Sequence, residues 1–133
     1  MIYAMFAMVV LTFMVGIVAV VNRVKSVNNG SVKIKYYRTM DGQEVPEQLT
    51  KSTRCFNNMF EVPVLFYVVS TLFVILKTNS ELVLLLAWVF VGFRIAQAIV
   101  HLTYNNVLHR MLMFWGAVIS VLSMWVILLI EIA

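Results

Sequence analysis

Cysteine and charge are both scarce in this sequence of 133 residues. Cys55 is the single cysteine, which excludes an internal disulfide and any zinc site built from cysteine ligands. Charged residues make up 12% of the chain, about half of their share in soluble globular proteins. The sequence also lacks a basic run typical of nucleic-acid binding, a glycine-rich phosphate loop, a Ser-His-Asp set and a carboxylate pair. We therefore expect no nucleic-acid partner and no metal site.

Apolar residues are abundant instead, at 62% of the chain with a mean hydropathy of +0.94. A bilayer with a hydrocarbon core of about 30 Å needs roughly 20 apolar residues in each helical span. Four runs meet this requirement, over residues 2–22, 54–76, 82–103 and 111–130. The first run has no basic segment before it and no small-residue cleavage site, so we expect it to be retained as a span. The sequence predicts a single domain over residues 1–133, an all-α integral membrane four-helix bundle.

The placement of basic residues predicts the orientation in the membrane. The predicted loop over residues 27–50 and its flanks contain Arg23, Lys25, Lys33, Lys35, Arg38, Lys51 and Arg54. Only Lys77 lies on the opposite side, so the loop is expected in the cytoplasm with both termini outside. Within this loop, residues 31–36 alternate in polarity and predict a short extended piece. Pro46 suits the first position of a helix, so the second helix is expected to begin in water near Val45.

Polar residues within or beside the predicted spans form one group: Arg54, Asn58, Glu61, Arg94, Gln97, His101 and Arg110. In a continuous helix, Arg54, Asn58 and Glu61 would lie within about 40° of one another. Gln97 and His101 follow Arg94 at similar helical spacing, and Arg110 opens the fourth span. Because the orientation places all of these residues in the cytoplasmic half, they predict one polar cluster that opens toward the cytoplasm.

Each of these residues also has a purely structural interpretation. Glu61 needs a partner inside the span, and Arg94 on the next helix could form a structural ion pair with it. Asn58 and Gln97 could join helices through hydrogen bonds worth about 1 kcal/mol each. The cluster is thus either a ligand site or a set of contacts that hold the helices together.

The remaining three residues have similar alternatives. Arg54 could extend its side chain toward the interface from an otherwise apolar helix. His101 is more readily explained as a satisfied interior histidine than as a metal ligand, because no second ligand is at suitable spacing. Arg110 could serve only as a signal for membrane orientation.

The segment Arg54-Cys-Phe-Asn-Asn58-Met-Phe-Glu61-Val-Pro63 resembles the second-helix motif of the MAPEG family. These are membrane-associated proteins of eicosanoid and glutathione metabolism, and they include microsomal glutathione transferases and prostaglandin E synthases. The family pattern is an Arg, an Asn four residues later, a Glu three after that, and then a Pro. Arg94 with Gln97 and His101, followed by Arg110, is similar to the family pattern in helices three and four. The resemblance covers essentially the whole chain and is to a bacterial-type member.

The resemblance implies a homotrimer with a glutathione site between subunits. In the family, the helix-two Arg, Asn and Glu and the helix-three Arg hold glutathione, which here implies Arg54, Asn58, Glu61 and Arg94. Gln97 and His101 occupy further ligand positions, and Arg23 matches a contributing Arg late in helix one. Arg110 matches the Arg that favours the thiolate, so it is the expected catalytic residue.

Two departures from the family pattern are visible. Pro63 follows Glu61 after two residues, where better-known members have three. His101 stands where those enzymes have a Tyr, and Gln97 stands where His or Tyr is common. Tyr104 is about 60° away from that stripe of the helix, so it is a poor substitute for the missing phenol.

The expected function is glutathione binding, with transferase or peroxidase activity on lipophilic electrophiles that reach the site from membrane lipid. Glutathione would be a co-substrate. The alternative is a non-catalytic protein of the same fold that binds a lipid headgroup or a small anion. The resemblance implies a bacterial inner membrane, with the site facing the cytoplasm.

Overall fold

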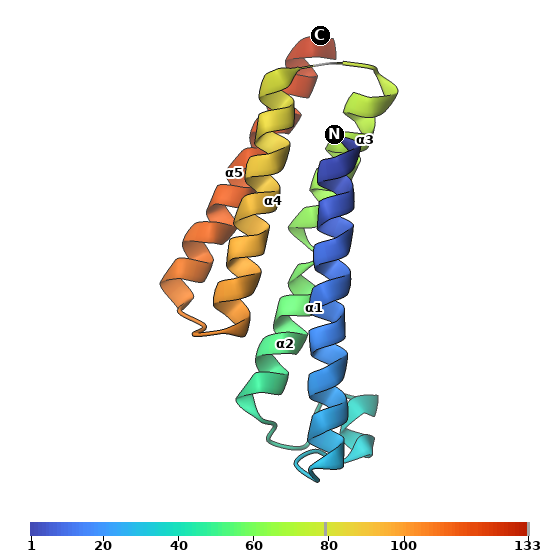
Figure 1. The fold of residues 1–133 in the computed structure, drawn as a ribbon, viewed down its shortest axis with the longest axis vertical. Coiled ribbons are helices and arrows are strands. Elements are labelled where there is room, and N and C mark those ends of the chain that lie inside the picture. The colour runs from blue at the N-terminus through green and yellow to red at the C-terminus, as the bar shows by residue number, and fades with distance from the viewer. Residues whose placement is uncertain (79, 133) are drawn as a thin grey trace.

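The protein is built from helices (Figure 1), in a computed structural model that describes residues 1–78 and 80–132. The elements are α1 (Ile2–Asn28), the 3₁₀ helix η1 (Ile34–Arg38), α2 (Glu47–Asn58), α3 (Val62–Ile75), α4 (Glu81–Leu102) and α5 (Val107–Ile132). None of the described residues forms a strand. The predicted all-α class is therefore confirmed.

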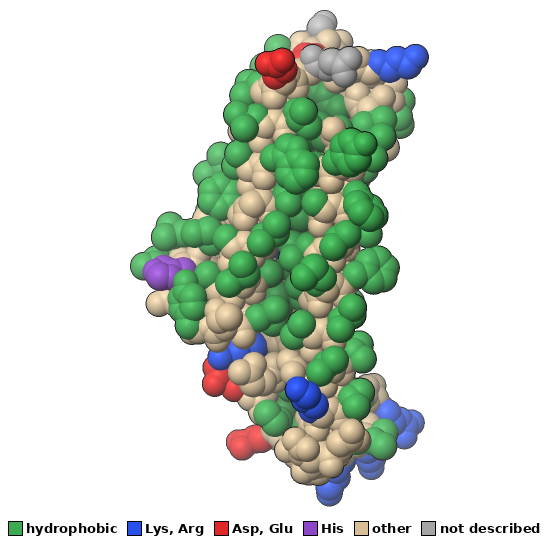
Figure 2. All heavy atoms as spheres, in the orientation of Figure 1, with side chains coloured by type: hydrophobic (Ala, Val, Ile, Leu, Met, Phe, Trp, Pro, Cys, Tyr) green, Lys and Arg blue, Asp and Glu red, His purple; other side chains and the backbone are tan. Residues whose placement is uncertain are grey.

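Four helical segments are long and apolar enough to cross a membrane: α1, Glu47–Ile75 with α2 and α3, α4, and α5. Their outward faces carry large exposed apolar side chains such as Ile17, Leu85 and Ile119, which suits contact with lipid. Figure 2 shows these apolar side chains over the middle of the visible face, with Lys and Arg gathered mainly at the end that carries the connection between α1 and α2. The predicted integral membrane four-helix fold is confirmed.

The second span is interrupted, although the sequence predicted one continuous helix over residues 54–76. It consists of α2 and α3, and Met59 to Glu61 separate the two helices. Pro63 is the physical cause, because its nitrogen has no hydrogen to donate to the carbonyl of Met59 and its ring would clash with that carbonyl. Proline is tolerated in the first turn of a helix, and Pro63 is the second residue of α3.

The helices pack through a few close contacts. Figure 1 shows α4 and α5 as a hairpin beside the other helices, and the two pack along their length. Gly116 on α5 makes their approach possible, because a Cβ atom there would lie 2.6 Å from the ring of Phe93 on α4. Phe66 on α3 stacks on Phe90 of α4 with ring centroids 4.4 Å apart. The core thus joins the hairpin to the interrupted second span.

The connection between α1 and α2 differs in detail from the prediction. α1 continues to Asn28 and α2 begins at Glu47 after Pro46, so the connection is shorter than the predicted loop over residues 27–50. The predicted extended piece at residues 31–36 was wrong, since residues 34–38 form η1. A tertiary contact accounts for this difference: the hydroxyl of Tyr37 lies 2.6 Å from the hydroxyl of Ser26 and so attaches η1 to α1.

Candidate functional site

Arg94, near the middle of α4, is completely buried and forms the centre of the polar cluster. Its Nη1 atom donates to Oε1 of Gln97 at 2.6 Å, one helical turn further along α4. Its Nη2 atom donates to the backbone carbonyl of Asn58 at 2.6 Å. Both nitrogens also approach Oδ1 of Asn58, at 3.2 and 3.3 Å. The guanidinium therefore joins the second span to α4.

The break in the second span makes the Asn58 carbonyl available to Arg94. In a continuous helix this carbonyl would accept the N–H of Val62, four residues later. Asn58 is the last residue of α2 and Val62 the first of α3, and no hydrogen bond between their backbones occurs in the described chain. Pro63 thus contributes to the site indirectly, because the break that it causes exposes the acceptor that Arg94 uses.

No carboxylate of the described residues forms an ion pair with Arg94, and the charge of Glu61 acts on it only from a distance. All its oxygen acceptors are neutral, and its Nε atom is buried without a hydrogen-bond partner. The one ion pair found among the described residues joins Lys51 to Glu47 at 2.8 Å, far from this position in the sequence. The structural Glu61–Arg94 ion pair, considered as an alternative from the sequence, is therefore not formed.

Glu61 and Arg54 are both exposed, and they do not share one helical stripe as predicted. Arg54 lies on α2, whereas Glu61 occupies the residue before α3 with φ −93° and ψ −98°. Those angles are not helical, so the seven-residue spacing no longer places the two side chains on a common face. Asn58, by contrast, lies half-buried on α2 and contacts Arg94, so the structure brings these two members of the predicted cluster together.

Gln97 and His101 continue the buried face of α4 beyond Arg94. Gln97 accepts from Arg94, and His101 lies close enough to Arg54 and Arg110 to be affected by their charges. No group of three or more His, Cys, Asp or Glu side chains in the described ranges could hold a metal ion. The predicted face of α4 is therefore present, and His101 on it lies near two arginines.

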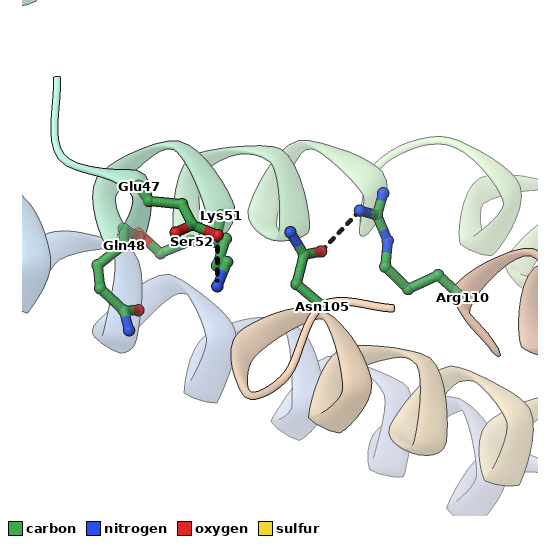
Figure 3. Close-up of polar contacts among 6 residues, drawn as sticks. All are labelled: Glu47, Gln48, Lys51, Ser52, Asn105 and Arg110. Atoms are coloured by element: carbon green, nitrogen blue, oxygen red, sulfur yellow. Dashed lines mark hydrogen bonds and ion pairs between the residues drawn. The ribbon is translucent and has the colours of Figure 1, made fainter. Parts of the chain in front are cut away.

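Arg110, in the first turn of α5, is half-buried and donates through Nη1 to Oδ1 of Asn105 at 2.8 Å. Its Nε atom is buried with no partner in the described structure. Figure 3 shows the Arg110 and Asn105 side chains pointing toward the second span. Cys55, buried on α2, lies within electrostatic range of both Arg110 and Arg94. Cations from α4 and α5 thus approach the same part of α2.

Arg23 lies apart from the Arg94 contacts, at one end of an apolar groove between α1 and α2. The groove has a volume of about 510 Å³ and includes Gly16, Phe56 and Phe60 in its lining. Arg23 is half-buried, and its Nε atom has no hydrogen-bond partner among the described atoms. No hydrogen bond among the described residues joins Arg23 to Arg94, so the structure does not connect these two predicted site residues directly.

The family comparison identifies the chain. The model of the MAPEG family matches residues 1–130, which include every helix except the last residues of α5. The chain belongs to the MAPEG family. No match was found among curated proteins or among solved structures. The chain is therefore a MAPEG membrane protein, and the family implies glutathione-related or eicosanoid metabolism.

For this MAPEG protein, the arrangement is suited to binding an anion. Arg54, Arg94 and Arg110 come from three different helices, and His101 or Cys55 lies within range of each of their charges. Arginine presents its donors in a planar fork that matches a carboxylate. A buried guanidinium with only neutral acceptors gains more from such a ligand than one that already has a carboxylate partner.

Two features of the site were not predicted from the sequence. The first is the Asn58 backbone carbonyl, because no sequence pattern assigns a role to a main-chain oxygen; Pro63 was the available signal. The second is Asn105, which has a positive φ of 51° after α4 and accepts from Arg110. The Asn105-Asn106 pair indicates a turn, although not its contact with Arg110. Tyr104 is exposed and its hydroxyl lies 2.9 Å from Nδ1 of His109, away from the Arg94 contacts.

Proposed function

We propose that this MAPEG protein binds glutathione at the Arg94 cluster and transfers its thiolate to lipophilic electrophiles. The observation that carries the proposal is the buried guanidinium of Arg94, which has neutral acceptors and no carboxylate partner in the described chain. Glutathione carries two carboxylates and one ammonium, so it offers the missing negative charge. Family membership supports the same ligand class.

Each ligand group has a proposed partner. Arg94 and Arg54 bind carboxylates, and Asn58, Gln97 and His101 contribute polar side chains beside them. Glu61 binds the ammonium, which agrees with its exposure and with the lack of an ion-pair partner within the described residues. Arg23 completes the set from the end of α1. Arg54 and Glu61 are exposed in one chain, whereas Arg94 is buried beneath them, so a neighbouring subunit would close the outer part of the site.

Arg110 is the proposed catalytic residue. A free thiol has a pKa near 8.5 and is largely protonated at neutral pH, and a nearby guanidinium stabilises the thiolate. The thiolate sulfur then donates an electron pair to an electrophilic carbon, so that a C–S bond forms and the bond to the leaving group breaks. With a hydroperoxide as acceptor, the thiolate would instead attack the terminal oxygen, so that an S–O bond forms, the O–O bond breaks and an alcohol leaves. A second glutathione would then convert the sulfenic acid to the disulfide and release water.

A homotrimer in a bacterial inner membrane is part of the proposal, with both termini outside and the site facing the cytoplasm. The excess of basic residues at the α1–α2 connection supports the orientation. Gly92 on α4 is exposed, and a Cβ atom added there would meet nothing within 4 Å, so this face is open to a neighbouring helix. Native mass spectrometry in a mild detergent is expected to show three chains, and monomers or dimers alone would contradict the trimer.

A titration of purified protein with glutathione tests the proposal. Wild-type protein should bind at millimolar or lower concentrations, and Glu61→Gln should weaken binding about tenfold or more because a hydrogen bond to a charged group is lost. The control is Glu81→Gln, at the start of α4, which should bind normally. Arg110→Ala should retain most of the affinity but slow conjugation to an activated aryl halide.

A second candidate function is non-catalytic binding of a lipid headgroup or small anion. The presence of His101 in place of the Tyr of better-known family members favours it, because that phenol lines their thiol site. If the phenol limits turnover, His101→Tyr should raise the conjugation rate. A folded, trimeric wild-type protein that binds no glutathione at millimolar concentrations would refute the transferase proposal and leave this second candidate.

A further inference from the structure

The connection over residues 29–46, here called the basic loop, is folded and not merely a charged linker. Val32 is buried, and its N–H donates to the carbonyl of Ser26 at 3.0 Å. The Gln43 side chain bridges two loop residues, donating to the carbonyl of Ser31 at 2.9 Å and accepting from the N–H of Lys33 at 3.2 Å. These contacts hold the basic loop against the end of α1.

The depth of the basic loop follows from its contacts with α1. Ile2–Val21 carries no charge and at 1.5 Å per residue is about 30 Å long, which matches the hydrocarbon core. The Tyr37 hydroxyl contacts Ser26 at 2.6 Å and the carbonyl of Arg23 at 3.5 Å. These residues lie about one helical turn beyond Val21, and the headgroup layer extends roughly 5–7 Å from the hydrocarbon. The 3₁₀ helix η1 therefore lies in the headgroup layer.

This short helix has one apolar and one basic side. In a 3₁₀ helix, residues three apart lie above one another, so Ile34 pairs with Tyr37 and Lys35 pairs with Arg38. Ile34 and Tyr37 line a hollow of about 360 Å³ together with Val24. Ile34 is 73% exposed, although η1 lies outside the four membrane-spanning segments. Ile34 is therefore placed to contact the acyl boundary.

The basic side lines a second hollow, of about 510 Å³. Lys33, Lys35 and Arg38 contribute three cations to its wall, and Asp41 contributes one carboxylate. Asp41 accepts the N–H of Gly42 at 2.7 Å, and none of the three cations forms an ion pair within the described residues. The positive-inside rule explains the sign of this charge but does not require it to be gathered around one hollow.

The geometry points to a site for the phosphate of anionic phospholipids in the adjacent leaflet, formed by Lys33, Lys35 and Arg38, with Ile34 against the acyl region. Three cations in the headgroup layer favour an anionic over a zwitterionic headgroup, and each contributes on the order of fivefold in affinity. The site is separate from the Arg94 cluster and does not depend on glutathione binding.

Native mass spectrometry of the full-length protein tests this inference. The protein is released from micelles that contain equal amounts of phosphatidylglycerol and phosphatidylcholine, and the retained lipids are counted. Wild-type protein should retain phosphatidylglycerol in excess, and the triple variant Lys33→Gln, Lys35→Gln, Arg38→Gln should lower that excess at least tenfold, from the per-cation effect above. The control Lys77→Gln, at the other end of the bundle, should behave as wild type, and Asp41→Asn should retain phosphatidylglycerol at least as well. An unchanged excess in the triple variant would overturn the site.

Two further measurements separate a lipid site from a site for free anions. Millimolar inorganic phosphate should not displace phosphatidylglycerol, because it cannot replace the acyl contact; full displacement would show a free-anion site and overturn the lipid assignment. A fluorophore on Ile34→Cys should be quenched by lipids with a nitroxide near the headgroup and protected from aqueous iodide; Cys55 is buried, so it competes little for the label. Strong iodide quenching without lipid quenching would contradict the depth assigned to η1.

Discussion

Replacing Pro63 by alanine should alter the site without touching a side chain in it. Alanine restores the N–H that proline lacks and permits a continuous helix through residues 47–75. The N–H of Val62 would then bind the Asn58 carbonyl, which Arg94 now holds at 2.6 Å. Arg94 would lose one of its two shortest hydrogen bonds, and Glu61 would move to the stripe that a continuous helix predicts.

The expected change in stability is small, because two larger effects oppose each other. A continuous helix gains backbone hydrogen bonds across the present break, each worth about 0.5–1.5 kcal/mol. Losing a hydrogen bond from a charged donor costs about 1.5–3 kcal/mol. The unfolding free energy of Pro63→Ala alone is therefore an insensitive test. The informative quantity is the coupling free energy between Pro63→Ala and Arg94→Lys. Lysine keeps the charge but has one nitrogen in place of the fork, so in the wild-type background it leaves the Asn58 carbonyl without its partner.

A double-mutant cycle of Pro63→Ala and Arg94→Lys, measured by reversible unfolding in mixed micelles with increasing SDS, provides the test. In the Pro63→Ala background the carbonyl already has a helical partner, so Arg94→Lys should cost about 1.5–3 kcal/mol less than in wild type. The same cycle with Pro46→Ala, which precedes α2, is the control and should show no coupling. Additivity of Pro63→Ala and Arg94→Lys within about 0.5 kcal/mol would refute the role of the break in forming the site.

Three other predictions follow from the packing and topology. Gly116→Ala should destabilise the α4–α5 hairpin by about 1–3 kcal/mol in the same SDS titration, because its Cβ would lie 2.6 Å from the Phe93 ring. The control Gly92→Ala has open space around it and should be neutral or slightly stabilising. Ser70→Ala should not destabilise the protein and is expected to stabilise it by about 1 kcal/mol or more, because Ser70 Oγ is buried without a partner in the described chain; a loss of stability would show a missed hydrogen bond. Cysteine placed at Lys35 should react with membrane-impermeant reagents only from the cytoplasmic side and cysteine placed at Lys77 only from outside, and the reverse pattern would overturn the proposed orientation.

The sequence was most informative where a single physical rule governs the structure. Hydropathy identifies the four spans because a bilayer requires long apolar helices whatever the details of packing. The spacing also placed Arg94 and Gln97 on one face of a helix, and they lie there because α4 is uninterrupted over this stretch; their hydrogen bond was not predicted. His101 is buried on that face for the same reason.

Helical spacing failed where the helix itself ends. Arg54, Asn58 and Glu61 were placed on one stripe, and Glu61 left it because α2 stops at Asn58. Pro63 was visible in the sequence, yet proline can kink a membrane helix, end it or be accommodated, and the sequence alone does not decide among these. The Glu61–Arg94 ion pair is not formed, and both terminal nitrogens of the guanidinium instead contact neutral acceptors on Asn58 and Gln97.

The fold of the basic loop could not be predicted from the sequence for a different reason. Alternating polarity at residues 31–36 suggested an extended segment, but so short a pattern has little weight against tertiary contacts. The hydrogen bond between Tyr37 and Ser26 joins residues eleven positions apart. The bond from Gln43 to the Ser31 carbonyl joins residues twelve positions apart. Such contacts depend on the path of the chain and are absent from any local pattern.

The use of a main-chain oxygen by Arg94 has a consequence for mutational scanning. Asn58→Ala would remove the contacts at 3.2 and 3.3 Å but retain the shortest one, at 2.6 Å, because every residue type supplies the same carbonyl. Alanine scanning would therefore underestimate the stabilisation that position 58 provides. Because Pro63→Ala would remove the helix break that frees this carbonyl, part of that stabilisation would be attributed to Pro63 instead. An ester bond between residues 58 and 59, made by chemical ligation, weakens the carbonyl as an acceptor while keeping both side chains. Tolerance of substitution at Asn58 would thus indicate that its role belongs to the backbone.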